Sequence, residues 1–180
     1  EDSKAKGRWE TNHGGEYFAA GVGGSITGRG ADLLIIDDPH TEQDSMSDSA
    51  MERAYEWYSS GPRQRLQPGG RILVVMTRWA TDDLTGRLIK AQSEPKADKW
   101  DVIEFPAILP NDQPVWPEYW SKEDLDSVKA SISTKNWNAQ YMQDPTSEEG
   151  AIIKREWWQD YDKEYLPKLL HVIQSYDTAF

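Results

Sequence analysis

An uninterrupted apolar run that ends in two carboxylates constrains this chain more than any other feature. Leu33–Ile36 leads directly into Asp37, Asp38 and Pro39. A continuous apolar run, rather than an alternating one, is typical of a strand buried within a parallel sheet. Proline then ends the strand because it has no N–H for the ladder. Since open α/β sheets bind ligands at the carboxyl ends of their strands, both acids are expected at a ligand site.

Two neighbouring carboxylates at a strand end suit Mg²⁺-dependent nucleotide hydrolysis. One carboxylate can hold Mg²⁺ through water while the next orients the attacking water. Asp37 closes the strand and is the better candidate for Mg²⁺, and Asp38 is the candidate for positioning water. An aspartate in the second place, where many motors use glutamate, requires a slightly different geometry. An ordinary strand that ends in an Asp-Asp-Pro turn remains the alternative.

A second apolar run offers a second strand tip. Arg71–Thr77 follows a Gly69-Gly70 turn and reads as another buried strand, which ends in Thr77-Arg78-Trp79. In a parallel sheet this tip can lie beside Asp37, where the Thr77 hydroxyl can sense a γ-phosphate or its water. Arg78 can pass that signal on or contact DNA. The alternative is an ordinary threonine at a strand end beside a packed tryptophan.

Helical patterns separate the apolar runs, which predicts a mainly parallel α/β sheet. One helix is expected from Ser49, with Ser49 and Glu52 as a capping box, to Gly61. A second is expected after Thr81 as its cap, with Asp82 and Asp83 in the first turn. A short strand at Tyr17–Val22 and a third apolar strand at Val102–Phe105 complete this half of the chain.

The second half is acidic and rich in tryptophan. Residues 101–180 carry seven basic and 15 acidic side chains, and most of the nine tryptophans lie there. Residues 111–119 read as a linker, Ser121 as a helix cap and Thr134–Met142 as a helix. Leu169–Tyr176 reads as a strand that ends at Asp177. The tryptophans fit core and interface anchors better than base-stacking platforms.

Composition narrows the class of protein. The net charge of −11 argues against a broad nucleic-acid-binding surface but permits a local basic track. Without cysteine there is neither a disulfide framework nor a cysteine-based zinc site. No apolar run approaches the length of a membrane span, so we expect a soluble, intracellular protein. The three histidines, His13, His40 and His171, show no metal-ligand spacing.

Arg29 is the remaining candidate for phosphate chemistry. It lies between Gly28 and Gly30, just before the first apolar strand, and an arginine presented to a neighbouring γ-phosphate stabilises transition-state charge. A solvated or salt-bridged arginine is the alternative. Gly23–Arg29 imitates a phosphate loop but lacks the Lys-Ser/Thr pair and precedes a strand instead of following one, so it is rejected.

Taken together, these segments resemble the large terminase subunit of tailed bacteriophages, the motor that packages DNA into a procapsid. The resemblance rests on the order and spacing of six segments across nearly the whole chain, namely Arg29-Gly30, Leu33–Asp38, Ile72–Trp79, Asp82–Leu88, Trp137–Pro145 and Ser175–Ala179. No single segment is specific, but the ordered set is.

The resemblance implies two enzymatic domains. Residues 1–110 would be the C-terminal part of a RecA-like ATPase, with Asp37 and Asp38 at the Walker B position, Thr77 in the coupling motif and Arg29 near a trans-acting arginine finger. Residues 111–168 would be a linker and helical region. Residues 169–180 would begin an RNase H-like nuclease, with Asp177 as its first metal-binding aspartate. Relatives often carry histidine where this chain has Ala80.

The same resemblance implies cofactors and partners. The ATPase would use ATP and Mg²⁺, and the nuclease Mg²⁺ or Mn²⁺. Partners would be double-stranded DNA, the portal protein, the small terminase subunit and further copies in a ring, with no membrane. The protein would act in the host bacterial cytoplasm and on the procapsid, and would not remain in the mature virion.

The family's phosphate loop is expected upstream of Glu1 and its other nuclease acids downstream of Phe180. The 180 residues alone are therefore expected to be inactive. Two other interpretations stay open. One is a different RecA-like helicase or translocase. The other is a non-enzymatic interaction domain whose acidic, tryptophan-rich half binds protein.

Overall fold

The computed structural model describes residues 7–24, 26 and 28–146. Every described residue belongs to one compact unit, Glu1–Ser147. The strand expected at Leu169–Tyr176 and the candidate metal ligand Asp177 lie outside the described residues.

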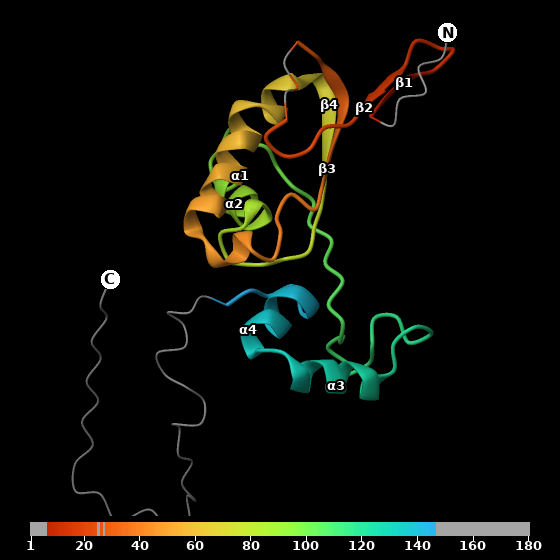
Figure 1. Cartoon of the computed structure of the whole chain (residues 1–180), viewed down its shortest axis with the longest axis vertical. Coiled ribbons are helices and arrows are strands. Elements are labelled where there is room, and N and C mark those ends of the chain that lie inside the picture. The colour runs from red at the N-terminus through yellow and green to blue at the C-terminus, as the bar shows by residue number, and fades with distance from the viewer. Residues whose placement is uncertain (1–6, 25, 27, 147–180) are drawn as a thin grey trace, which may run out of the picture. The chain divides into compact units, whose positions relative to one another are not determined.

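A parallel pair of strands forms the centre of the α/β part (Figure 1). Strand β3 (Ala31–Asp37) pairs with β4 (Leu66–Val75), in a register that sets Leu33 opposite Arg71 and Asp37 opposite Val75. Both strands were expected from their apolar runs, and their parallel pairing is confirmed. The fold of the described part is mixed α/β, with two strands in each of its two sheets.

One face of this pair is covered by helices. Helices α1 (Asp48–Ser60) and α2 (Leu84–Ala91) supply Tyr58, Leu84 and Leu88, which form a buried core with Ile36 of β3. Leu34, Ile72 and Val74 pack against that core. Because side chains alternate across a strand, the residue between Leu34 and Ile36 and the residue between Ile72 and Val74 lie on the other face of the sheet.

The other face of the pair is open. Leu33 and Ile35 of β3 are 57% and 55% exposed, and Leu73 and Val75 of β4 are 50% exposed. The expectation that both strands are buried is therefore wrong for one face within the described part of the chain. The reason is that helices α1 and α2 pack on the same side, whereas a continuous apolar run anticipates cover on both.

Gly69 and Gly70 form an irregularity inside β4 rather than the expected turn before it. Ala31 pairs with Leu66, but Leu33 already pairs with Arg71, so β4 carries extra residues between these two points. Gly69 has φ +82°, which glycine adopts without steric cost. The strand therefore begins at Leu66, after the 3₁₀ turn η2 (Pro62–Arg65).

The N-terminal caps of α1 and α2 each lie two residues away from the expected caps. The cap of α1 is Ser47, whose side chain accepts from the Ala50 N–H at 3.3 Å, and not Ser49. A 3₁₀ turn, η1 (Asp44–Met46), directly precedes it. The cap of α2 is Asp83 and not Thr81, since the Asp83 carboxylate accepts from the Gly86 N–H.

The predicted third strand at Val102–Phe105 is wrong. Residues 101–106 carry no regular structure, and no described strand pairs with them. Ile103 and Phe105 are correspondingly exposed. An apolar, β-branched run favours an extended backbone, but it becomes a strand only where an adjacent strand forms backbone hydrogen bonds with it.

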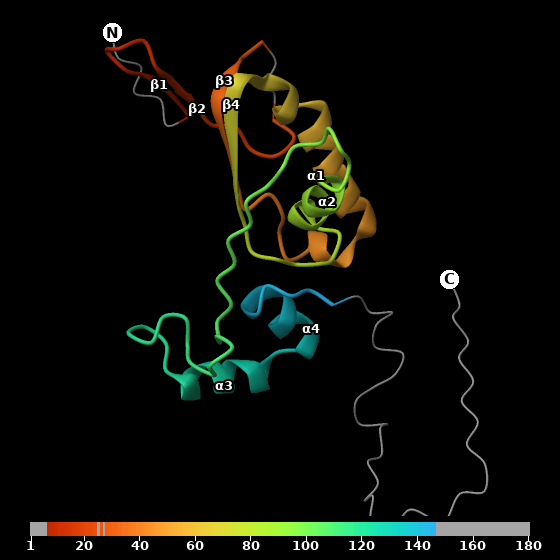
Figure 2. The same cartoon turned by 180° about the vertical axis from the view of Figure 1, so that it is seen from behind.

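At the N-terminal side, β1 (Arg8–Glu10) and β2 (Glu16–Phe18) form a short antiparallel hairpin. Figure 2 shows it from behind, next to the start of β3. The strand expected at Tyr17–Val22 is thus confirmed only in part.

Residues 107–144 form a helical region with a small core. Helix α3 (Lys122–Ser131) has the expected cap, with Ser121 and Asp124 in a capping box. Helix α4 (Thr134–Asn136) continues into the π-helical turn η3 (Trp137–Tyr141), as the helix predicted over Thr134–Met142 requires. Leu125, Trp137 and Ala139 are buried. The expected linker at 111–119 is ordered, since Pro114 forms a β-bridge with Ile108.

Candidate functional site

The carboxyl ends of β3 and β4 bring three of the predicted site residues together. Asp37 lies opposite Val75 in the ladder, and the Asp38 N–H donates to the Val75 carbonyl at 2.9 Å. The Thr77 N–H donates to Asp38 Oδ1 at 3.1 Å. The two strand tips therefore lie side by side, as expected for a parallel pair.

Asp38 has a strained backbone. Its φ is +40°, a region that few residues other than glycine adopt, although aspartate is among the more tolerant. The following Pro39 further restricts its conformation. Strain of this kind persists where the surroundings fix it, and here two hydrogen bonds to β4 and Thr77 do so. The carboxylate is consequently held in one position.

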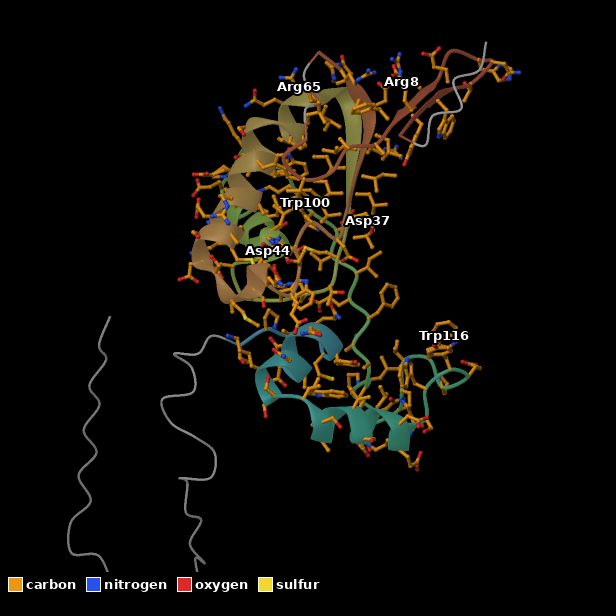
Figure 3. The ribbon with its side chains drawn as sticks, in the orientation of Figure 1. Arg8, Asp37, Asp44, Arg65, Trp100 and Trp116 are labelled. Carbon is orange, nitrogen blue, oxygen red and sulfur yellow. The ribbon has the colours of Figure 1, made fainter. Side chains whose placement is uncertain are left out.

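Asp37 is placed differently from its neighbour. It has the same parity along β3 as Leu33 and Ile35, so it belongs to the open face of the sheet. Its side chain is exposed, and within the described residues it makes no hydrogen bond or ion pair. Figure 3 marks Asp37 at the end of the strand. It is a carboxylate whose oxygens are free to bind a cation.

Arg78 is committed to a buried carboxylate. Its Nε lies 2.9 Å from Asp83 Oδ2, and Asp83 is fully buried. The Asp83 carboxylate also accepts from the N–H groups of Trp79, Ala80 and Gly86. Asp83 thus connects the segment after β4 to the first turn of α2. The predicted role of Arg78 in contacting DNA would require this ion pair to break.

His40 provides a second link between a strand tip and α2. Its Nε2 accepts from the Leu84 N–H at 2.9 Å, and the side chain is only 4% exposed. An Nε2 that accepts must be unprotonated, so the neutral ring carries its proton on Nδ1. Burial lowers the pKa of His40, although Asp83 and Asp44 oppose that shift.

The sequence offered no signal for His40. Its partner is 44 positions away, and a single histidine after Asp-Asp-Pro has no metal-ligand spacing. His40 Nδ1 is buried without a hydrogen-bond partner in the described part of the chain. The Asp82-Asp83 pair indicated the first turn of a helix, but the sequence did not identify Asp83 as the buried partner of Arg78.

Arg29 lies at the other end of the sheet. It precedes the first residue of β3, whereas Asp37 is the last, and a strand of this length spans about 20 Å. Its guanidinium pairs with Glu16 and lies 4.3 Å from the centre of the Phe18 ring. Within one chain Arg29 therefore does not join the strand-end residues.

A divalent cation fits the strand ends only in part. No group of three or more His, Cys, Asp or Glu side chains among the described residues is arranged to hold a metal. Mg²⁺, however, is commonly bound by one or two carboxylates together with waters and substrate phosphates. Asp37 fits such a role. The sequence contains no phosphate loop to complete it.

A cavity lies beside this site but has a different character. It has a volume of about 390 Å³ and includes Thr77 and Arg78 in its wall, but neither Asp37 nor Asp38. The rest of its wall is mainly apolar, with Val75, Leu88, Trp100 and Ile103 among the residues. It lacks the cluster of hydrogen-bond donors that the phosphates of a nucleoside triphosphate require.

Comparisons with known proteins assign no family. No protein-family model matches the sequence, and no curated protein is significantly similar to it. Among the described residues, none of the helices combines the length and apolar composition needed to cross a bilayer.

Proposed function

We propose that this chain is part of an ATP-driven viral DNA-packaging motor, the large terminase subunit of a tailed bacteriophage. The observation that carries the proposal is the contact between the two strand tips, in which the Thr77 N–H donates to Asp38 Oδ1 beside Asp37. A hydrolytic motor needs a metal-binding carboxylate, a water-positioning group and a sensor at one sheet edge.

Each residue would have a distinct role in hydrolysis. Asp37, exposed and unpaired within the described residues, would hold Mg²⁺, which supplies charge stabilisation to the phosphates of ATP. Asp38 would orient the attacking water, since its backbone and one carboxylate oxygen are already fixed. Thr77 would report the state of the γ-phosphate to α2 through the adjoining Arg78–Asp83 pair.

The proposal also covers the finer fold, the nuclease domain and the partners that the resemblance to terminase large subunits implies. The finer fold would be RecA-like for residues 1–110, followed by the helical region and the first strand of an RNase H-like nuclease. Asp177 would bind Mg²⁺ or Mn²⁺ there. Double-stranded DNA, portal protein, the small subunit and further copies in a ring would be the partners, in the bacterial cytoplasm and on the procapsid.

Arg29 fits this proposal only as a residue acting on a neighbouring subunit. Its position at the amino end of β3 keeps it away from Asp37 of its own chain. To act in trans it would have to exchange Glu16 and Phe18 for a γ-phosphate. Both present partners are on the β1–β2 hairpin, so that hairpin would hold the arginine between catalytic events.

The test is ATP hydrolysis by the complete gene product that contains these residues. Asp37→Asn should abolish Mg²⁺-dependent turnover by about a thousandfold or more without changing the unfolding midpoint. Asp32→Asn, at the other end of the same strand, is the matched control and should leave turnover unchanged. Full turnover in the Asp37→Asn variant would refute the proposal.

The alternative function is a protein-interaction domain without catalysis. It is favoured by one observation, the exposed aromatic side chains Trp116 and Tyr119 in the acidic half of the chain. Under this alternative, no ATP turnover would be found with or without the Asp37→Asn substitution.

A further inference from the structure

Three aromatic side chains gather on one exposed turn before α3. Trp116, Tyr119 and Trp120 belong to a turn in which the Trp116 carbonyl accepts the N–H groups of both Tyr119 and Trp120, at 3.1 and 3.0 Å. The rings of Trp116 and Tyr119 stack with centroids 5.0 Å apart, and Trp120 meets Tyr119 edge to face. We call this group the aromatic platform. Figure 3 marks Trp116.

The aromatic platform is not part of the hydrophobic core. Trp116 and Tyr119 are 58% and 65% exposed, whereas Trp137 of the same helical region is 2% exposed. Trp137 stacks on Tyr141 and anchors the region from within. Exposed aromatic rings gathered in one place are uncommon on a protein surface and mark sites of interaction.

A groove adjoins the platform. It has a volume of about 200 Å³, and its wall includes Trp116 and Trp120 of the platform and the buried Leu125, together with Phe105, Val115 and Tyr141. Because Leu125 is buried in the core and the turn is held by its own hydrogen bonds, the groove is formed before any ligand binds. Its size suits one or two apolar side chains of a peptide rather than a large cofactor.

The charge around the platform selects the class of partner. Residues 111–126 contain five acidic side chains and one basic one, Lys122, which is itself paired with Asp112. Glu118 lies within the aromatic turn and Glu123 in the first turn of α3. Both are exposed, and neither makes an ion pair within the described residues. Unpaired carboxylates beside aromatic faces favour a cationic ligand, through charge and cation–π attraction.

The β1–β2 hairpin provides an internal comparison. Trp9 and Tyr17 stack there with the same centroid separation of 5.0 Å. The neighbouring carboxylates Glu10 and Glu16, however, are paired with Arg8, and Glu16 also with Arg29. The hairpin therefore has the aromatic pair without the unpaired acids, and its residues line neither the cavity beside Thr77 nor the groove beside the platform.

We propose that the aromatic platform and its groove bind a basic peptide segment of a partner protein, with an apolar side chain in the groove and arginine or lysine over Trp116 and Tyr119. This site is separate from the strand-end residues and does not depend on the proposed ATPase function. Nucleic acid is disfavoured because its phosphates would face Glu118 and Glu123.

The test measures binding of three fluorescent probes to the 180-residue chain by anisotropy. The probes are a short peptide that alternates leucine and arginine, a peptide that alternates leucine and glutamate, and an oligothymidylate. We expect the leucine–arginine peptide to bind at least about tenfold more tightly than either other probe, and to weaken as salt rises. Trp116→Ala and Tyr119→Ala should each weaken it about tenfold while leaving the unfolding midpoint unchanged.

Matched variants separate this site from general electrostatic attraction. Tyr17→Ala removes an exposed tyrosine from an equivalent stacked pair and should leave binding unchanged. Glu118→Gln combined with Glu123→Gln should weaken binding about threefold or more and reduce its salt dependence. Three results would each overturn the proposal. These are equal binding of the acidic peptide, tighter binding of the oligothymidylate, and self-association of the chain that Trp116→Ala abolishes.

Discussion

The Arg78 guanidinium and the Asp83 carboxylate form a buried ion pair in which Nε lies 2.9 Å from Oδ2. Asp83 at the same time caps α2 through Gly86 and accepts from the backbone of Trp79 and Ala80. One carboxylate therefore joins the end of β4 to the start of α2. This junction lies directly after Thr77, so the position of the second strand tip depends on it.

The first prediction concerns this pair. Asp83→Asn removes the negative charge and leaves Arg78 without its partner in a largely buried place, so we expect a loss of about 3 kcal/mol in the free energy of unfolding. Asp82→Asn, next to it, removes an exposed carboxylate 3.6 Å from Arg87 and should cost less than about 0.5 kcal/mol. Urea denaturation of both variants provides the comparison, and equal stability of the two would contradict it.

The second prediction concerns Gly86. A glycine within a helix is normally improved by alanine, by up to about 1 kcal/mol. Here a Cβ at Gly86 would lie 2.0 Å from the Thr81 carbonyl oxygen, which is backbone and has little freedom to move. Gly86→Ala should therefore destabilise the chain, by about 2 kcal/mol, as overpacking does.

Gly30 is the control for that substitution. A Cβ there would also meet an atom at 2.1 Å, but that atom is the end of the flexible, exposed Gln67 side chain. Gly30→Ala should therefore change the unfolding midpoint little. Thermal unfolding of both variants is the measurement, and an unchanged midpoint for Gly86→Ala would show that the turn before α2 can rearrange.

The parallel pair could be predicted from sequence because its signals are local. Leu33–Ile36 and Ile72–Val75 are continuous apolar runs, and a helical pattern lies between them, which together imply a parallel connection. The capping box at Ser121 and Asp124 is likewise contained in four residues. Adjacency of Asp38 and Thr77 then followed from the geometry of parallel strands.

What could not be predicted depends on partners distant in the chain. His40 bonds to Leu84, and nothing near either residue indicates the other. Val102–Phe105 has strand-like composition, but no described strand pairs with it. Gly69 reads as a turn from its type alone, and only the pairing of Leu33 with Arg71 places it inside β4. Leu33 and Ile35 are apolar, as residues on a covered face would be, so their residue types do not indicate that this face of the sheet is open.

The third prediction concerns pH and His40. Burial lowers the pKa of the folded His40 below the ordinary value of 6.5. The unfolded chain therefore binds the proton more readily, and the stabilising contribution of the neutral ring is complete above about pH 6.5 and declines as the pH falls below it. The nearby charges that oppose the shift are Asp83 and Asp44.

Unfolding by urea between pH 7.5 and about pH 5 tests this window. The wild-type free energy of unfolding should fall by at most about 1.4 kcal/mol per pH unit, and the fall should be smaller in His40→Gln. Hydrogen bonds from Thr41 are the main cause of the lowered pKa of Asp44. Asp44 therefore changes the free energy of unfolding only near and below pH 3.8, which is outside the measured range. If the free energy of unfolding of His40→Gln changed with pH as steeply as that of the wild type, the pH dependence would belong to another group.

The fourth prediction separates the backbone role of Asp38 from its charge. Asparagine tolerates a positive φ and keeps an oxygen to accept from the Thr77 N–H, so Asp38→Asn should change the free energy of unfolding by less than about 0.5 kcal/mol. Alanine loses that acceptor and must adopt the same φ of +40°, so Asp38→Ala should cost about 1–2 kcal/mol.

The two variants are also expected to differ in what they report about activity. In the complete gene product both should lose ATP turnover if the Asp38 carboxylate orients water, since neither retains the charge. Only Asp38→Ala should lose stability as well. Turnover retained by Asp38→Asn together with a stability loss in Asp38→Ala would mean that Asp38 serves the strand junction alone, through Thr77 and Val75.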